Sequence, residues 1–95
     1  MYPLSRAMAE IQVERTPNPN SLKFTALDGG FFHDDVVAAS SKEEAERHPL
    51  AATLFSLSGV DDVFITPEFV TVSKTPSKDW DDLQAEVKTT LSDYL

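Results

Sequence analysis

The chain has 95 residues, of which 41% are hydrophobic, and its sixteen acidic against eight basic side chains give a net charge of −8. A chain of this length forms one domain and buries only about 60–70% of the surface that its unfolded form exposes, so we expect one modest core and no deep active-site cavity. The acidic balance argues against nucleic-acid binding, because phosphates require a basic face, and against anionic membrane surfaces. The complete absence of cysteine removes disulfides, thiolate nucleophiles and the usual ligands of zinc and iron–sulfur clusters.

The N-terminal segment 1–9 lacks the continuous apolar stretch of a signal peptide. We interpret it as a flexible extension that precedes a single domain at 10–95. No apolar run in the sequence is long enough to span a membrane. Small secreted domains often need disulfides, which this chain cannot form. The sequence therefore predicts a cytoplasmic protein.

Two strand patterns open the domain, over 10–15 and 22–26. In the first, Ile11 and Val13 alternate with polar residues, and the second alternates in the same way, which is typical of half-buried strands. The segment between them, 16–20, reads TPNPN. Each proline fixes its own φ near about −65° and pushes the preceding residue out of the helical region. We therefore predict a stiff, extended turn.

The middle of the chain contains helix signals. Segment 31–37 is ambiguous and is compatible with a short edge strand. Ser41 and Glu44 have the spacing of a capping box, in which each side chain satisfies a free backbone donor. Pro49 lacks an N–H and must interrupt the helix, but it suits the first turn of a new helical segment with His48 as its cap. The apolar face of that segment recurs at i, i+4 and i+7, through Leu50, Leu54 and Leu57.

The last third predicts a β-hairpin and a helix. Segments 60–65 and 69–74 are rich in β-branched residues and flank a proline turn. A final helix is expected from a cap at Ser77, with Trp80 in its apolar stripe. The order strand, strand, helix, strand, strand, helix predicts an α+β fold. We expect a four-stranded, mainly antiparallel sheet with two helices packed on one face.

Several blocks of the sequence resemble the N-terminal domain of Nfu/NifU-type iron–sulfur scaffold proteins. These are TPNPNSLKF at 16–24, PLAATLF at 49–55, GVDDVFI at 59–65, FVTVSK at 69–74, and Trp80. The resemblance implies the same four-stranded sheet and a place in iron–sulfur cluster biogenesis. In full-length members a second domain carries a C-x-x-C pair that holds the cluster, whereas this chain has no cysteine. The resemblance therefore implies a non-catalytic accessory module that has no cofactor and does not itself hold a cluster.

We predict that the TPNPN turn is a partner-binding surface, because a rigid turn that presents two amides loses little entropy on binding. The simpler alternative is that its prolines only orient the hairpin. Two lysines on adjacent strands are expected to add a small basic spot on the sheet face away from the helices, although the sequence leaves the register of the second open. The predicted partner is a protein, either a separate C-x-x-C scaffold or an iron–sulfur client. The predicted partner-binding residues are Thr16, Pro17, Asn18, Pro19, Asn20, Lys23 and Lys74.

The alternative function is binding of iron or another divalent metal. His33, Asp34 and Asp35 offer an imidazole and two carboxylates. Neighbours on an extended chain point in opposite directions, however, so at most two of the three converge, and a solvated loop is the simpler interpretation. The carboxylate pairs at 61–62 and 81–82 are sequence neighbours and do not face each other across a cleft. We therefore expect no catalytic residues and no enzymatic activity.

Overall fold

The computed structural model describes residues 11–27, 32 and 36–94. The predicted N-terminal extension at 1–9 lies outside the described residues, and so do His33, Asp34 and Asp35. The predictions made for these two segments therefore stay predictions.

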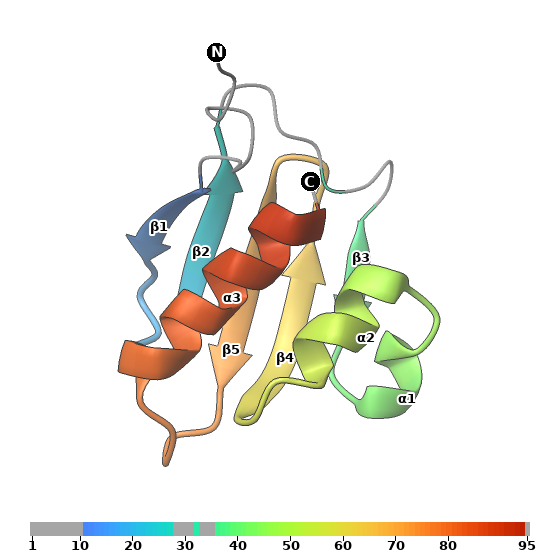
Figure 1. The fold of residues 1–95 in the computed structure, drawn as a ribbon. Helices are drawn as coiled ribbons and strands as arrows, with labels where there is room; N and C mark the ends of the chain where they lie inside the picture. The colour runs from blue at the N-terminus through green and yellow to red at the C-terminus, as the bar shows by residue number, and fades with distance from the viewer. Residues whose placement is uncertain (1–10, 28–31, 33–35, 95) are drawn as a thin grey trace.

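In the described part of the chain, five strands form one antiparallel sheet in the order β1-β2-β5-β4-β3 (Figure 1). Two hairpin pairs, β1–β2 and β4–β5, meet at the centre of the sheet, where β2 pairs with β5. Antiparallel hairpins can be joined by short connections, which fits the two proline turns that the sequence contains. The strands are β1 (Ile11–Arg15), β2 (Ser21–Ala26), β3 (Val37–Ala39), β4 (Val60–Ile65) and β5 (Phe69–Lys74).

All helices of the described residues lie on the same side of this sheet (Figure 1). They are α1 (Lys42–Ala45), α2 (Pro49–Phe55) and α3 (Trp80–Tyr94). The long helix α3 crosses in front of β2 and β5, and α2 lies over β4. None of the helices that the structure describes combines the length and apolar character that crossing a bilayer requires.

The α+β class and the antiparallel sheet are confirmed, but four strands and two helices are too few. The additional strand, β3, has only three residues and pairs Ala38 with Phe64 of β4 at the sheet edge. The possible edge strand predicted over 31–37 overlaps β3 only at Val37, and most of that segment lies outside the described residues. The three residues of β3 are too few to show a period of two in the sequence. The additional helix arises because the helical region is divided before Pro49. His48 leaves the helical conformation with φ −135° and its Nδ1 accepts a hydrogen bond from the Ala51 N–H at 3.4 Å.

The predicted cap at Ser41 is confirmed, since Ser41 Oγ accepts from the Glu44 N–H at 3.2 Å. The reciprocal half of the capping box is shifted by one residue, because Glu44 Oε1 accepts from the Ser40 N–H at 2.8 Å and not from that of Ser41. The predicted start of the last helix at Ser77 is wrong, because α3 begins at Trp80. The residues before it form a turn instead, which is closed by a hydrogen bond from the Lys78 N–H to the Thr75 carbonyl at 3.1 Å.

The core lies between the helices and the sheet. Its side chains come from alternate positions of the strands and from one stripe of α3, as the periods of two and 3.6 require. Removing the apolar surface of these side chains from water is the main favourable contribution to folding. The largest fully buried side chains are Phe24, Leu50, Leu54, Ile65, Leu83, Leu91, Val63, Val70, Val72 and Val87.

Candidate partner-binding site

The TPNPN turn joins β1 to β2 and is held by its own hydrogen bonds. The Thr16 hydroxyl accepts from the Asn18 N–H at 3.1 Å and lies 2.9 Å from the Asn18 carbonyl and 3.1 Å from that of Ser21. Asn18 Oδ1 accepts from the Asn20 N–H at 2.9 Å, and the Asn18 carbonyl accepts from the Ser21 N–H at 3.0 Å. These bonds make the turn rigid, as its two prolines predict.

The second amide of the turn faces inward. Lys74 at the end of β5 is only 8% exposed, and its Nζ donates to Asn20 Oδ1 at 3.1 Å and to the Thr75 carbonyl at 3.4 Å. The main chains are also linked, since the Lys74 N–H donates to the Asn20 carbonyl at 2.8 Å. A buried ammonium group requires such acceptors. Asn20 therefore has a structural role in this arrangement, whereas the amide nitrogen of the exposed Asn18 side chain has no protein partner among the described residues.

The predicted basic spot formed by two lysines is wrong. Lys23 of β2 is opposite Thr71 of β5, so Lys74, three residues further along β5, points to the other face of the sheet. Lys74 lies on the side of the buried valines and the helices. Lys23 lies on the open side, where its Nζ is 4.5 Å from the centre of the Phe69 ring and 4.0 Å from Glu14 Oε1. The alternation of β5 in the sequence was the signal that would have separated the two lysines.

Trp80, the first residue of α3, ties this helix to the turn. Its indole Nε1–H donates to the Pro19 carbonyl at 3.1 Å. Its ring also lies 6.4 Å from that of Phe24, at an interplanar angle of 58°, which is a favourable tilted arrangement. The indole is half-buried and packs against the core. The prediction that Trp80 belongs to the apolar stripe is therefore correct, but the residue also forms part of the surface beside the turn.

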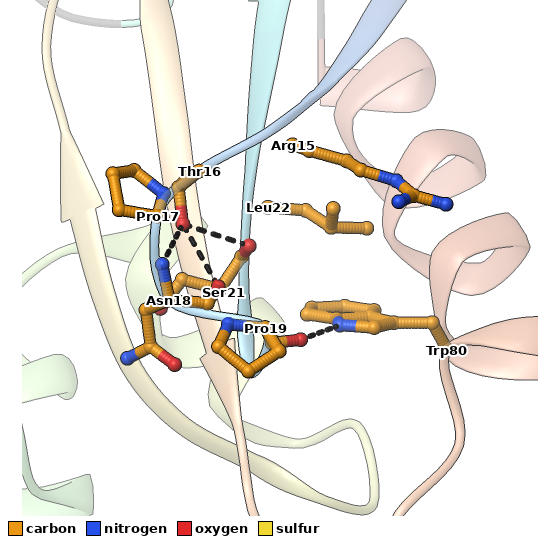
Figure 2. Close-up of a pocket in the computed structure, with 8 residues that line it drawn as sticks. All are labelled: Arg15, Thr16, Pro17, Asn18, Pro19, Ser21, Leu22 and Trp80. Atoms are coloured by element: carbon orange, nitrogen blue, oxygen red, sulfur yellow. Dashed lines mark hydrogen bonds between the residues drawn. The ribbon is translucent and has the colours of Figure 1, made fainter.

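A cavity of about 310 Å³ lies between the turn, β2 and Trp80 (Figure 2). Figure 2 shows the Arg15 side chain and the Trp80 indole on either side of Leu22. The sequence predicted four of the turn residues that line the cavity but not Arg15, Ser21 and Leu22, which flank the turn on the two strands. Trp80 was assigned to the core in preference to a binding role, because it is far from the turn along the chain and nothing in the sequence places it there. The lining residues are Arg15, Thr16, Pro17, Asn18, Pro19, Ser21, Leu22 and Trp80.

The chemistry of this lining suits binding. Arg15 is its one charged side chain, and no described residue forms a hydrogen bond or ion pair with the guanidinium group. The lining contains no carboxylate and no imidazole that would act as a general base. Over the described ranges, no group of three or more histidine, aspartate and glutamate side chains is arranged to hold a metal ion.

One carboxyl group of the described residues has a perturbed pKa, and it lies away from the cavity. Burial raises the pKa of Asp62 in β4 above its usual 3.8, and the nearby charges of Asp61 and Glu44 raise it further. The Val63 N–H, which hydrogen-bonds to this carboxylate, opposes the shift. The causes are ordinary structural ones, so this shift does not by itself indicate a catalytic group.

Comparison with known proteins first places the chain among small α+β domains of iron–sulfur scaffold proteins. A NifU-like protein from Saccharomyces cerevisiae superimposes with a TM-score of 0.81 at 25% identity, covering 96% of this chain and 82% of the yeast chain. Protein SAV1430 from Staphylococcus aureus shares the fold, with a TM-score of 0.69 at 19% identity, covering 87% of this chain and 99% of that one. The family model described as "Scaffold protein Nfu/NifU N terminal" matches residues 11–95. The chain therefore belongs to the Nfu/NifU N-terminal family.

Two curated relatives agree with this assignment. The human "NFU1 iron-sulfur cluster scaffold homolog, mitochondrial" is 38% identical over 87 residues, which is 90% of this chain and 34% of the relative. The protein of the same name from Drosophila virilis is 35% identical over 95 residues, 100% of this chain and 32% of the relative. This chain thus spans about a third of the length of the curated relatives that it matches.

The names of these relatives contradict the predicted cytoplasmic location, since both are mitochondrial proteins. The prediction rested on the missing disulfides and on the lack of a secretory signal, and neither property separates the cytoplasm from the mitochondrial interior.

Proposed function

We propose that the chain is a non-catalytic protein-interaction module of iron–sulfur cluster assembly, which contacts a cluster-bearing scaffold or a client protein through the surface formed by the TPNPN turn and Trp80. Its membership of the Nfu/NifU N-terminal family supports the pathway. The rigid turn beside an open cavity supports the mode of action, because a preformed surface binds at a low cost in conformational entropy. Mitochondria are the compartment in which we expect this contact, as for the named relatives.

The observation that carries the proposal is the combination of a scaffold-family domain with a total lack of cysteine. Iron–sulfur clusters are held chiefly by cysteine thiolates. The chain therefore contributes binding rather than cluster coordination. On anaerobic incubation with ferrous iron and sulfide, followed by desalting, we expect no cluster absorbance in the visible range. A stable cluster on the isolated chain would contradict this proposal.

The direct test is affinity purification of the tagged chain from a mitochondrial extract, with the captured proteins identified by mass spectrometry. We expect a C-x-x-C scaffold or an iron–sulfur client among them. Arg15→Gln should reduce its recovery, because it removes the one charge of the cavity lining. Lys23→Gln is the matched control, since it removes the same charge from the opposite side of the sheet. Asn20 is unsuitable for this test because its loss would leave Lys74 without an acceptor.

Two results would count against this function. Capture of no protein of cluster assembly would remove the proposed pathway role of the chain. Capture that is equally weakened by Arg15→Gln and Lys23→Gln would keep the interaction but remove the turn and its cavity as the contact site.

A further inference from the structure

We propose that the cavity beside Trp80 binds a segment of the partner protein in which a side-chain carboxylate lies next to an apolar side chain. This inference rests on the proposed function and names the chemistry of its contact site. It follows from the polar groups of the cavity that are still unused, from the apolar walls, and from the cavity volume.

The side-chain polar groups of the cavity that remain unused are donors. Arg15 carries five N–H groups in a fixed fork, and no described residue accepts from them. The exposed Asn18 side chain adds its NH₂ group, because its oxygen is already bonded to the Asn20 N–H. The Trp80 N–H is bonded to the Pro19 carbonyl. A ligand must therefore bring an acceptor to Arg15, and a carboxylate matches the guanidinium fork with two parallel hydrogen bonds.

The backbone of the turn favours a side-chain carboxylate over a chain terminus. Capture of a terminal carboxylate uses a nest of free backbone N–H groups. The N–H groups of Asn18, Asn20 and Ser21 are all bonded within the turn, and Pro17 and Pro19 have none. The long Arg15 side chain and the exposed Asn18 amide are therefore the donors that remain, and the Arg15 fork suits a carboxylate presented on a side chain.

The apolar half of the ligand follows from the walls and the volume. Pro17, Pro19, Leu22 and Trp80 present rings and methyl groups to the cavity. Its volume of about 310 Å³ is at the lower end of the range of about 300–1,000 Å³ found for ligand pockets. It accommodates one or two side chains of a peptide, and an apolar one gains free energy by displacing water from these walls.

The overall negative charge of the chain opposes an acidic ligand only at long range. Charges separated by more than about 8 Å in water are largely screened at physiological ionic strength. The first turn of α3 does contain Asp81 and Asp82, but neither lines the cavity. The contact with Arg15 therefore decides that the cavity prefers a negatively charged ligand, and the net negative charge of the chain only slows the approach of that ligand.

Trp80 provides a direct probe, because it is the one tryptophan of the chain and it lines the cavity. We would titrate the 95-residue chain with acetylated and amidated peptides and follow the Trp80 emission. The first peptide is Ala-Ala-Leu-Glu-Ala-Ala, and the others replace its Glu by Gln or by Lys. A fourth peptide, acetyl-Ala-Ala-Ala-Ala-Leu with a free terminal carboxylate, distinguishes the two sources of the carboxylate.

The Glu peptide is expected to bind about tenfold more tightly than the Gln peptide, and the Lys peptide more weakly still. Arg15→Gln should weaken binding of the Glu peptide about tenfold and abolish its advantage over the Gln peptide. Arg15→Lys should have an intermediate effect, because a lysine keeps the charge but loses the fork. Lys23→Gln, the matched control, should leave the affinity within about twofold, since its charge is exposed on the other side of the sheet.

The inference would be overturned by equal binding of the Glu and Gln peptides, by tighter binding of the Lys peptide, or by tightest binding of the free-terminus peptide. Equal losses in Arg15→Gln and Lys23→Gln, or an unchanged Trp80 emission at millimolar peptide, would overturn it as well. Its failure is distinguishable from failure of the proposed function. Capture of a cluster-assembly protein without binding of the Glu peptide removes only the ligand chemistry, and binding of the peptide without such capture removes only the pathway.

Discussion

Asn20 and Lys74 show at the residue scale why the turn is part of the fold as well as a surface. The buried ammonium group of Lys74 is bonded to the Asn20 side chain and the Thr75 carbonyl, and its nitrogen lies 5.9 Å from the centre of the Trp80 ring. No carboxylate forms an ion pair with it among the described residues. Neutral oxygens and an aromatic face must therefore replace the water that Lys74 loses on burial.

We predict that Asn20→Ala lowers the free energy of unfolding by about 1–3 kcal/mol, because it leaves a buried donor without one of its acceptors. In a Lys74→Met background the same change should have a smaller effect, since the donor is gone. Urea denaturation of the four proteins of this double-mutant cycle measures the difference. Equal losses in both backgrounds would show that the Asn20–Lys74 bond contributes nothing and that Asn20 acts through the turn alone.

Gly59, before β4, is the second residue whose identity the fold requires. It has φ +96°, a conformation that residues with a Cβ rarely adopt. A Cβ at this position would lie 2.6 Å from Lys78 Cγ. Gly59→Ala should therefore lower the free energy of unfolding by about 1–3 kcal/mol, from backbone strain and from this contact.

A second variant separates the two causes. Lys78→Ala removes the Cγ and Cδ atoms, which would lie 2.6 and 3.0 Å from the added Cβ, but it keeps the Lys78 Cβ at 3.0 Å and leaves the backbone strain at Gly59 unchanged. We expect the Gly59→Ala, Lys78→Ala protein to recover part of the lost stability relative to Lys78→Ala alone. Full recovery would attribute the whole loss to the contact with the outer Lys78 side chain, and no recovery would attribute it to the backbone strain together with the remaining Lys78 Cβ contact.

At the scale of elements, the interaction between α1 and β4 is electrostatically unfavourable. Asp62 in β4 lies near Asp61 and near Glu44 of α1, and burial adds to their effect on its raised pKa. A carboxyl group with a raised pKa binds a proton more readily in the folded than in the unfolded chain. Stability is therefore lost as the pH rises from the unfolded pKa of 3.8 through the higher folded pKa.

We predict that Asp62→Asn stabilises the protein at pH 7, by less than about 0.5 kcal/mol because the group is partly exposed. The gain should shrink as the pH falls through the raised folded pKa of Asp62 towards the unfolded value of 3.8, because the wild-type carboxyl group is then itself increasingly protonated. Thermal denaturation of both proteins at a series of pH values tests this. A gain that is constant with pH would show that the effect comes from the amide and not from the charge.

The elements themselves were largely predictable from the sequence, because local patterns decide them. Segment 69–74 was predicted with the bounds that β5 has, and Pro49 divides the helices where its missing N–H requires. The edge strand β3 was not predictable, since its three residues form a strand only through pairing with β4. The start of α3 was misplaced because several polar residues before Trp80 all resemble caps.

The candidate site was only half predictable for a related reason. The rigidity of the TPNPN turn is local and was visible in its prolines and asparagines. The cavity depends on the bond between the Trp80 indole and the Pro19 carbonyl, whose residues are 61 positions apart. No pattern in a single sequence specifies that contact. The side of the sheet on which Lys74 lies was predictable, in contrast, because Lys74 follows Val70 and Val72 at a spacing of two and so shares their buried face.

Charge dominates at the scale of the whole molecule. The net charge of −8 is spread over a small domain, and the ion pair found within the described ranges is the exposed contact of Lys23 with Glu14 at 4.0 Å. Such exposed pairs contribute about 0–1 kcal/mol. Repulsion among the excess carboxylates should therefore outweigh attraction in the folded state, and it also keeps the protein soluble and favours basic or locally complementary partners.

Salt should for this reason stabilise the protein. Between about 0.01 and 0.15 M NaCl the screening length falls from about 30 to about 8 Å, which weakens repulsion between distant carboxylates. We expect the Tm to rise by about 2–5 °C, which for a domain of this size corresponds to at most about 1 kcal/mol. Thermal denaturation followed by circular dichroism measures this increase.

A charge-reduced variant is the matched control for the salt effect. Glu46→Lys and Glu86→Lys replace two exposed acids and change the net charge from −8 by +2 each, to −4. Because less repulsion remains to be screened, the rise in Tm with salt should be clearly smaller in this variant than in the wild type. A Tm that falls with salt in the wild type would mean that attractive pairs dominate. Equal rises in both proteins would indicate an effect of salt on hydrophobic burial rather than on charge, because burial strengthened by salt does not depend on the two substituted glutamates.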